Sequence, residues 1–150
     1  MEKSKNAELT FGHALPWDVA EVRQLLDMSK LPSEDIGEHI AHVLVARLGG
    51  RIVGVAGLEL SGSSAVLRSL AVIAHKQGTS LGKELYGRIV DYAKSLGVKE
   101  LGLLTTTAEG FFSKAGFTRI EKDQWPEYIR TTKEYRFYCP STAVFMTKSI

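Results

Sequence analysis

The 150-residue sequence has little of what marks several special classes of protein. Its single cysteine, Cys139, excludes an internal disulfide and favours a reducing compartment such as the cytoplasm. Four prolines and 14 glycines are too few for a fibrous or disordered chain. No apolar run is long enough to cross a bilayer, and the first residues lack the apolar centre of a secretion signal. We therefore expect a soluble cytoplasmic protein with neither a membrane segment nor a bound metal.

An excess of one charge is also lacking. The sequence has 19 basic and 17 acidic residues, which give a net charge of +2. This near balance argues against nucleic acid or a membrane surface as the partner. Hydrophobic residues make up 44% of the chain, and its length suits one domain over residues 1–150.

The spacing of apolar residues predicts strands and helices in alternation, without an internal repeat. The expected strands are 8–12, 42–48, 51–60, 65–74, 99–107, 117–123 and 142–150. The expected helices are 16–28, 80–96, 108–116 and a segment from Pro126 towards Tyr138, while 31–41 forms a loop or short helix. The glycine pair at 49–50 predicts a hairpin. Together these elements predict an α/β (α+β) fold, a mixed sheet of about six to seven strands with helices on both faces, closed by the last strand.

The turn from the third long strand into the helix at 80–96 is rich in small residues. Gln77–Gly82 reads Q-x-x-S-x-G, and the first turn of the following helix offers free N–H groups to an anion. This pattern indicates a phosphate site. The sequence contains neither a P-loop nor the glycine pattern of dinucleotide-binding folds, so a nucleoside triphosphate or a nicotinamide dinucleotide is disfavoured.

The stretch "LRSLAVIAHKQGTSLGKEL" resembles the pyrophosphate loop of the GNAT family of N-acetyltransferases, with Ser80 where the family usually has glycine. Downstream, "TAEGFFSKAGF" resembles the second cofactor segment of that family. The resemblance implies a splayed pair of parallel strands, "LRSLAV" and "ELGLLTT", with acetyl-CoA as cosubstrate. The implied contacts to pantetheine are Leu70, Ala71, Val72 and Phe112, and those to pyrophosphate are Gln77, Gly78, Thr79, Ser80, Leu81 and Gly82. Lys83 either assists in binding the phosphates or belongs to a solvated basic helix end.

Acetyl transfer to an amine also needs groups that move protons. Many family members use a tyrosine as the acid where this chain has Phe112, so Phe112 is a core residue or a wall beside pantetheine. Glu59 is a candidate base, with a solvent-facing carboxylate as the alternative. Ser69 is a second catalytic candidate. His75 and Cys139 are weaker candidates, since a solvated histidine and a small buried cysteine are the commoner cases.

Acceptor binding is predicted from charged and aromatic residues near the strand ends. Arg68 lies inside an apolar run, and its charge requires either an acceptor carboxylate or an ion pair with Glu59. Thr106 ends the other central strand. Tyr128 and Arg130 belong to a segment suited either to lining an acceptor cleft or to packing over the sheet.

The acceptor class follows from a narrower resemblance. "LRSLAV", "LLTTTAEGFFSKAGF" and "CPSTAVFMTK" resemble acetyltransferases of arsenic-resistance operons, and the tail also resembles short N-acetylglutamate synthase-like enzymes. Both resemblances imply a small acidic amino acid acceptor, or an arsenic-containing glutamate-like compound, held by Arg68. Acetylation of a protein or peptide, and a non-catalytic acyl-CoA sensor, remain open. Since many relatives are dimers, a homodimer is also an option.

Overall fold

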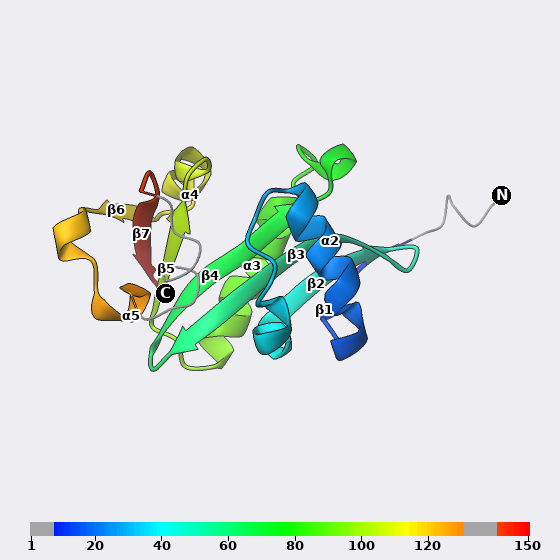
Figure 1. Ribbon diagram of the computed structural model, residues 1–150, viewed down its shortest axis with the longest axis horizontal. Coiled ribbons are helices and arrows are strands. Elements are labelled where there is room, and N and C mark those ends of the chain that lie inside the picture. Colours follow the sequence, from blue (N-terminus) through cyan, green and yellow to red (C-terminus); the bar gives the residue numbers. More distant parts are fainter. Residues whose placement is uncertain (1–7, 131–140) are drawn as a thin grey trace. The chain divides into compact units, whose positions relative to one another are not determined.

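The computed structural model describes residues 8–130 and 141–150. Seven strands form a mixed sheet in the order β1-β2-β3-β4-β5-β7-β6 (Figure 1). The strands are β1 (Leu9–His13), β2 (Val43–Leu48), β3 (Arg51–Ser61), β4 (Ser64–Val72), β5 (Glu100–Thr105), β6 (Thr118–Ile120) and β7 (Val144–Ser149). The predicted mixed sheet is therefore confirmed.

The helices include four α-helices and four short 3-10 segments in the described part of the chain. They are η1 (Pro16–Asp18), α2 (Val19–Met28), η2 (Ile36–His42), η3 (Ala74–Lys76), α3 (Leu81–Ser95), α4 (Glu109–Lys114), η4 (Lys122–Gln124) and α5 (Glu127–Arg130). Of the helix expected from Pro126, the structure shows α5, and residues 131–138 lie outside the described residues. No helix of the described residues is long and apolar enough to cross a membrane.

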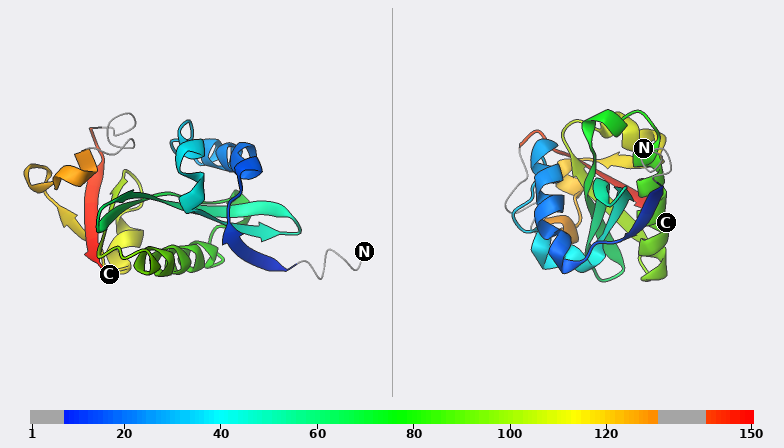
Figure 2. Two further views of the ribbon diagram at one scale, coloured as in Figure 1. Left: turned by 90° about the horizontal axis from the view of Figure 1, so that it is seen from below. Right: turned by 90° about the vertical axis from the view of Figure 1, so that its right-hand side faces the viewer.

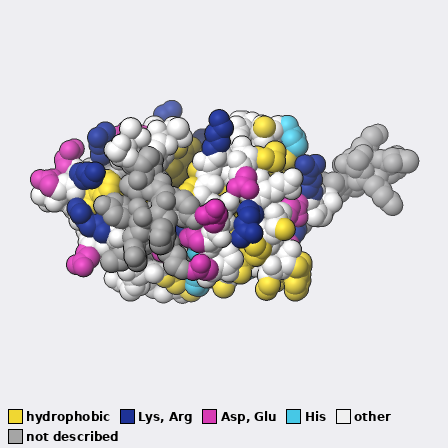
Figure 3. All heavy atoms as spheres, viewed as in Figure 1, with side chains coloured by type: hydrophobic (Ala, Val, Ile, Leu, Met, Phe, Trp, Pro, Cys, Tyr) yellow, Lys and Arg dark blue, Asp and Glu magenta, His cyan; other side chains and the backbone are white. Residues whose placement is uncertain are grey.

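The chain divides into two compact units, and strands β3 and β4 contribute to both. Unit 1 comprises Met1–Leu58 and Ser69–Val90, and unit 2 comprises Glu59–Arg68 and Asp91–Ile150. The organisation of residues 1–150 as one domain stays a prediction. On the face drawn in Figure 3, acidic and basic side chains are interspersed, as their nearly equal numbers suggest.

In unit 1, β1, β2 and β3 form antiparallel pairs, and the hairpin between β2 and β3 is confirmed. Gly49 and Gly50, which connect these strands, have φ angles of 60° and 83°. Two consecutive positive φ angles are what a two-residue hairpin turn requires, and glycine adopts them at little cost.

Helices α2 and α3 cover opposite faces of the sheet in unit 1 (Figure 2). Helix α3 turns its buried leucines towards Gly54 of β3, where a Cβ atom would lie 2.6 Å from Leu85 Cδ1 and 3.6 Å from Leu81 Cδ2. The helical spacing of Leu81, Leu85 and Ile89 predicted this buried face, and each is at most 4% exposed. Glycine at position 54 thus permits the close approach of α3 to the sheet.

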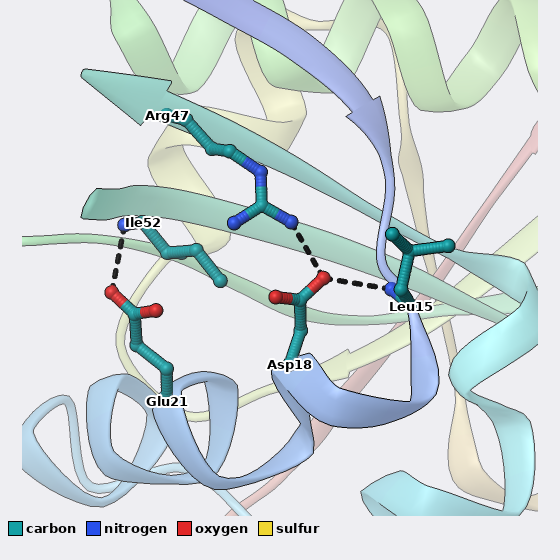
Figure 4. Close-up of polar contacts among 5 residues, drawn as sticks. All are labelled: Leu15, Asp18, Glu21, Arg47 and Ile52. Atoms are coloured by element: carbon teal, nitrogen blue, oxygen red, sulfur yellow. Dashed lines mark hydrogen bonds and ion pairs between the residues drawn. The ribbon is translucent and has the colours of Figure 1, made fainter. Parts of the chain in front are cut away.

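A buried carboxylate attaches the start of α2 to the sheet (Figure 4). Asp18 Oδ2 accepts hydrogen bonds from Arg47 Nη2 at 2.5 Å and from the backbone N–H of Leu15 at 2.8 Å. Glu21 Oε2 accepts a hydrogen bond from the backbone N–H of Ile52 at 2.8 Å. Burial alone would raise the pKa of Asp18, but the two hydrogen bonds and the charge of Arg47 together lower that pKa below its usual value.

In unit 2, β4 and β5 are the predicted parallel neighbours. Their pairing joins Ser64–Val66 to Glu100–Gly102, while β4 continues to Val72 and β5 to Thr105. The last strand, β7, pairs antiparallel with both β5 and β6, so it lies inside the sheet and the short β6 forms the edge. Our expectation that the last strand closes the sheet is therefore wrong.

The core of unit 2 is formed by apolar residues from β4, β7 and the segment that contains α5. Val66, Trp125, Ile129 and Phe145 are buried together. Gly102 of β5 faces this cluster, since a Cβ atom there would lie 2.6 Å from Tyr128 Oη and 2.8 Å from Phe145 Cε1. An aromatic ring and a hydroxyl thus occupy the space that a side chain at position 102 would need.

Candidate functional site

The connection from β4 to α3 has the geometry of a site that offers backbone N–H groups. Gly78 and Ser80 have φ angles of 83° and 68°, both in the left-handed region. Ser80 thus adopts the conformation for which glycine is usually selected, at a cost of about 1 to 2 kcal/mol. We call Gln77–Gly82 the phosphate loop.

Internal hydrogen bonds hold the phosphate loop against the end of β4. Gln77 Nε2 donates to the carbonyl oxygen of Val72 at 3.0 Å, and Thr79 Oγ1 donates to the carbonyl oxygen of Lys76 at 2.5 Å. A Cβ atom at Gly78 would meet nothing within 4 Å, so the loop faces open space there. The first N–H groups of α3 have no partner within the helix and carry the positive end of its dipole. The loop therefore has the features of an anion-binding segment, as the sequence predicted.

A pocket of about 230 Å³ lies beside the phosphate loop. Its wall includes Lys76, Thr79 and Ser80 from the connection, Glu84 from α3, and apolar side chains from β1, β2 and α3. The structure thus brings three predicted phosphate-loop residues, Thr79, Ser80 and Leu81, together with a lysine that can offset negative charge.

Strand β4 leads from this loop back towards Ser69. Ala71 and Val72 are buried, and Leu70 is partly exposed. Ser69 is 6% exposed and has a φ angle of 63°, which breaks the regular strand conformation. A non-glycine residue in this region costs about 1 to 3 kcal/mol, and such residues cluster at functional sites.

In unit 2, Arg68 is held by an ion pair. Its Nη1 atom lies 3.2 Å from Glu59 Oε1, and the side chains are 1% and 20% exposed. Of the two partners that the sequence left open for Arg68, the internal one is therefore observed. The Glu59 side chain at the same time remains partly exposed to solvent.

Residues 9–117 match the sequence profile of the acetyltransferase (GNAT) family. This chain belongs to the GNAT acetyltransferase family. The match covers β1 to α4 and so includes the phosphate loop and Arg68.

Relatives of this GNAT chain are amino-acid acetyltransferases and an uncharacterised family member. An uncharacterised N-acetyltransferase of Chlorobaculum tepidum is 32% identical over 68% of this chain and 66% of its own. An amino-acid acetyltransferase of Neisseria meningitidis is 29% identical over 69% of this chain, but this alignment spans only 24% of that enzyme.

Solved structures agree on the fold. N-acetylglutamate synthase of Neisseria gonorrhoeae, complexed with coenzyme A and N-acetyl-glutamate, superposes with a TM-score of 0.81 at 23% identity, covering 96% of this chain and 35% of that one. Rv2747 of Mycobacterium tuberculosis, also in complex with CoA, gives a TM-score of 0.79 at 22% identity and covers 94% and 99% of the two chains.

Phe112, at the position of the usual GNAT tyrosine, lies in an aromatic cluster. It is 7% exposed, and its ring packs edge-on against Phe111 at 5.0 Å and Phe117 at 5.5 Å between centroids. A phenyl ring cannot donate a proton. Phe112 therefore cannot be the acid that many GNAT proteins have at this position.

The other predicted acceptor residues have internal roles in the structure. Tyr128 Oη donates to Glu100 Oε2 at 2.9 Å, and burial, this hydrogen bond and the charge of Glu100 raise the pKa of Tyr128. Arg130 Nη2 donates to the carbonyl oxygen of Lys122 at 3.1 Å. Thr106 is exposed after the end of β5. The roles of Thr106, Tyr128 and Arg130 in acceptor binding stay predictions.

The remaining catalytic candidates from the sequence are His75 and Cys139. His75 is exposed in η3. Cys139 lies outside the described residues. Among the residues that the structure describes, no group of three or more metal-ligating side chains is present.

Proposed function

We propose that this GNAT protein transfers the acetyl group of acetyl-CoA to the primary amine of a small amino acid. The observation that carries the proposal is the phosphate loop, in which Gly78 and Ser80 hold left-handed conformations directly before the N-terminus of α3. Backbone N–H groups of this loop would bind the diphosphate, with Lys83 nearby in the sequence. Leu70, Ala71 and Val72, which we call the pantetheine segment, would bind the pantetheine arm.

Acetyl-CoA supplies an acyl group on a thiol leaving group. When the acceptor is acetylated, the new C–N bond forms and the C–S bond breaks. An ammonium acceptor gives up two protons in total, of which one is returned to the CoA sulfur and one is released. We assign Glu59 as the base that takes the first proton, directly or through water.

The acceptor is proposed to be an amino acid with a free carboxylate. The buried guanidinium of Arg68 can bind a carboxylate through two parallel hydrogen bonds, and Glu59 beside it favours the ammonium group. The similarity to amino-acid acetyltransferases and to a synthase crystallised with N-acetyl-glutamate supports an acidic amino acid. An arsenic-containing glutamate analogue has the same two charged groups and is included as a candidate.

The test is release of CoA thiol from acetyl-CoA with a panel of acceptors. We expect turnover with glutamate or its analogues, and at least about tenfold lower kcat/KM with the corresponding amides, which lack the negative charge. Arg68→Lys keeps the charge but loses the planar fork, so it should raise the acceptor KM about tenfold and leave the acetyl-CoA KM unchanged.

Arg47→Lys is the matched control, because Arg47 is also ion-paired but with Asp18. Equal effects of both variants on the acceptor KM would contradict the role of Arg68. Turnover with peptides but not with amino acids would contradict an amino acid acceptor and favour a peptide acceptor. Tight CoA binding without turnover of any acceptor would favour a non-catalytic acyl-CoA sensor. This alternative is considered because Phe112 stands where many GNAT proteins have a catalytic tyrosine.

A further inference from the structure

Ser69 has a backbone conformation that differs from the extended conformation of a regular strand. Its φ angle of 63° lies in the left-handed region in the middle of a strand, where extended values are the norm. Glycine would adopt this conformation without strain, and yet the chain has serine. Serine differs from glycine at this position by its side-chain hydroxyl group.

The Ser69 hydroxyl is also unsatisfied. The residue is 6% exposed, and Oγ has no hydrogen-bond partner among the residues that the structure describes. Buried hydroxyls are normally paired, and an unpaired one at a strained position indicates a partner that arrives with a ligand.

Ser69 lies on the strand that leads into the phosphate loop. The side chain of Gln77 ties the phosphate loop to the carbonyl oxygen of Val72, so the loop stands at one end of the pantetheine segment. Ser69 precedes Leu70 at the opposite end, about 10 Å from Val72 at the usual rise of a strand. A pantetheine arm that starts at the loop and follows β4 would therefore place its thioester end towards Ser69.

We propose that the Ser69 hydroxyl donates a hydrogen bond to the carbonyl oxygen of the transferred acetyl group. This role rests on the proposed function. As the amine nitrogen bonds to the carbonyl carbon, negative charge develops on that oxygen, and a fixed donor stabilises it. The C–S bond then breaks and the charge returns to the carbonyl. The hydroxyl keeps its proton throughout, so no further reactant is needed.

Burial makes this donor effective. A hydroxyl shielded from water interacts more strongly with developing charge than a solvated one, and the left-handed backbone fixes its direction in advance. Neither the ring of Phe112 nor the apolar side chains of the pantetheine segment can donate a hydrogen bond.

The experiment compares Ser69→Gly and Ser69→Ala with the wild-type protein. Ser69→Gly removes the hydroxyl and relieves the backbone strain, so the unfolding midpoint should rise by about 2 to 4 °C. The kcat should nevertheless fall about 100-fold, while the dissociation constant for CoA stays within about twofold. Ser69→Ala removes the hydroxyl without relieving φ and should show the same loss of kcat.

Lys30→Gly is the control. Lys30 follows the end of α2, is exposed, and has a φ angle of 60°, so glycine relieves the same strain outside the proposed machinery. We expect a similar rise in midpoint with unchanged kcat.

A Ser69→Gly enzyme with wild-type kcat would overturn the role of Ser69 alone. A loss of CoA affinity that accounts for the whole loss of activity would also overturn it. Absence of wild-type turnover with every acceptor would overturn the proposed function as well, so the two failures are distinguishable.

Discussion

Three non-glycine residues in the described part of the chain have positive φ angles: Lys30, Ser69 and Ser80. Each conformation would normally be marked in a sequence by glycine. The resemblance to GNAT proteins indicated Ser80, because the family usually has glycine there. No sequence signal marked Ser69 as strained, since "LRSLAV" reads as an ordinary buried strand. Two of these residues are serines that flank the proposed acetyl-CoA site. One lies in the phosphate loop and the other at the far end of the pantetheine segment, so backbone strain is concentrated along this site.

Polar partners were only partly predictable at this scale. The buried charge of Arg68 in an apolar run required a partner, and Glu59 was one of two candidates. The pair of Asp18 with Arg47 was not expected, because the two residues are 29 positions apart and neither lies in a recognisable motif. Such long-range pairs depend on how strands and helices pack.

The lowered pKa of Asp18 makes stability depend on pH. A carboxyl group whose pKa is lower in the folded than in the unfolded state contributes fully above its unfolded pKa of about 3.9. This contribution is lost as the pH falls through the lower folded pKa. Asp18→Asn should reduce the free energy of unfolding by about 1 to 3 kcal/mol at pH 7, and the difference should shrink below about pH 4.

Urea unfolding at pH 7 and pH 3 measures this effect. Asp123→Asn, an exposed substitution in η4, is the control and should change stability by less than about 0.5 kcal/mol at either pH. A cost of Asp18→Asn that is the same at both values would show that the charge of Asp18 is not what stabilises the start of α2.

At the scale of elements, local signals predicted most of the structure. The glycine pair at 49–50 predicted the β2–β3 hairpin, and helical spacing followed by Gly97 predicted α3, which ends at Ser95. The position of β7 between β5 and β6 was not predictable, because strand order depends on pairing between segments distant in the sequence.

Two glycines in elements that follow each other along the chain, Gly87 in α3 and Gly102 in β5, should show opposite changes in stability when replaced by alanine. At Gly102 in β5, a methyl group would meet Tyr128 Oη at 2.6 Å and Phe145 Cε1 at 2.8 Å, so the cluster must shift and the Tyr128–Glu100 hydrogen bond must weaken. We expect Gly102→Ala to destabilise the protein by about 1 to 3 kcal/mol.

Gly87 in α3 is the matched position. A Cβ atom there meets nothing within 4 Å, so Gly87→Ala should stabilise the protein by about 0.5 to 1 kcal/mol through helix propensity. Urea unfolding of both variants measures the difference. A neutral Gly102→Ala would contradict the close packing of the aromatic cluster against β5.

At the scale of the whole molecule, composition and the order of elements indicated the fold class, and the seven-stranded mixed sheet agrees with it. Motifs indicated the phosphate loop, because it is a continuous stretch of sequence whose proposed contacts come from the backbone. Acceptor binding was harder to predict, because it depends on separate side chains brought together by folding. Tyr128 and Arg130 illustrate this, since each has an internal partner that the sequence did not reveal.

A crystal structure of the protein with CoA is the most direct test of the proposed acetyl-CoA site. We expect phosphate oxygens of the diphosphate within about 2.7 to 3.2 Å of backbone nitrogens of the phosphate loop. The pantetheine arm should follow Leu70–Val72 towards Ser69. A coenzyme bound elsewhere, with Gln77–Gly82 making no contact to phosphate, would contradict the account.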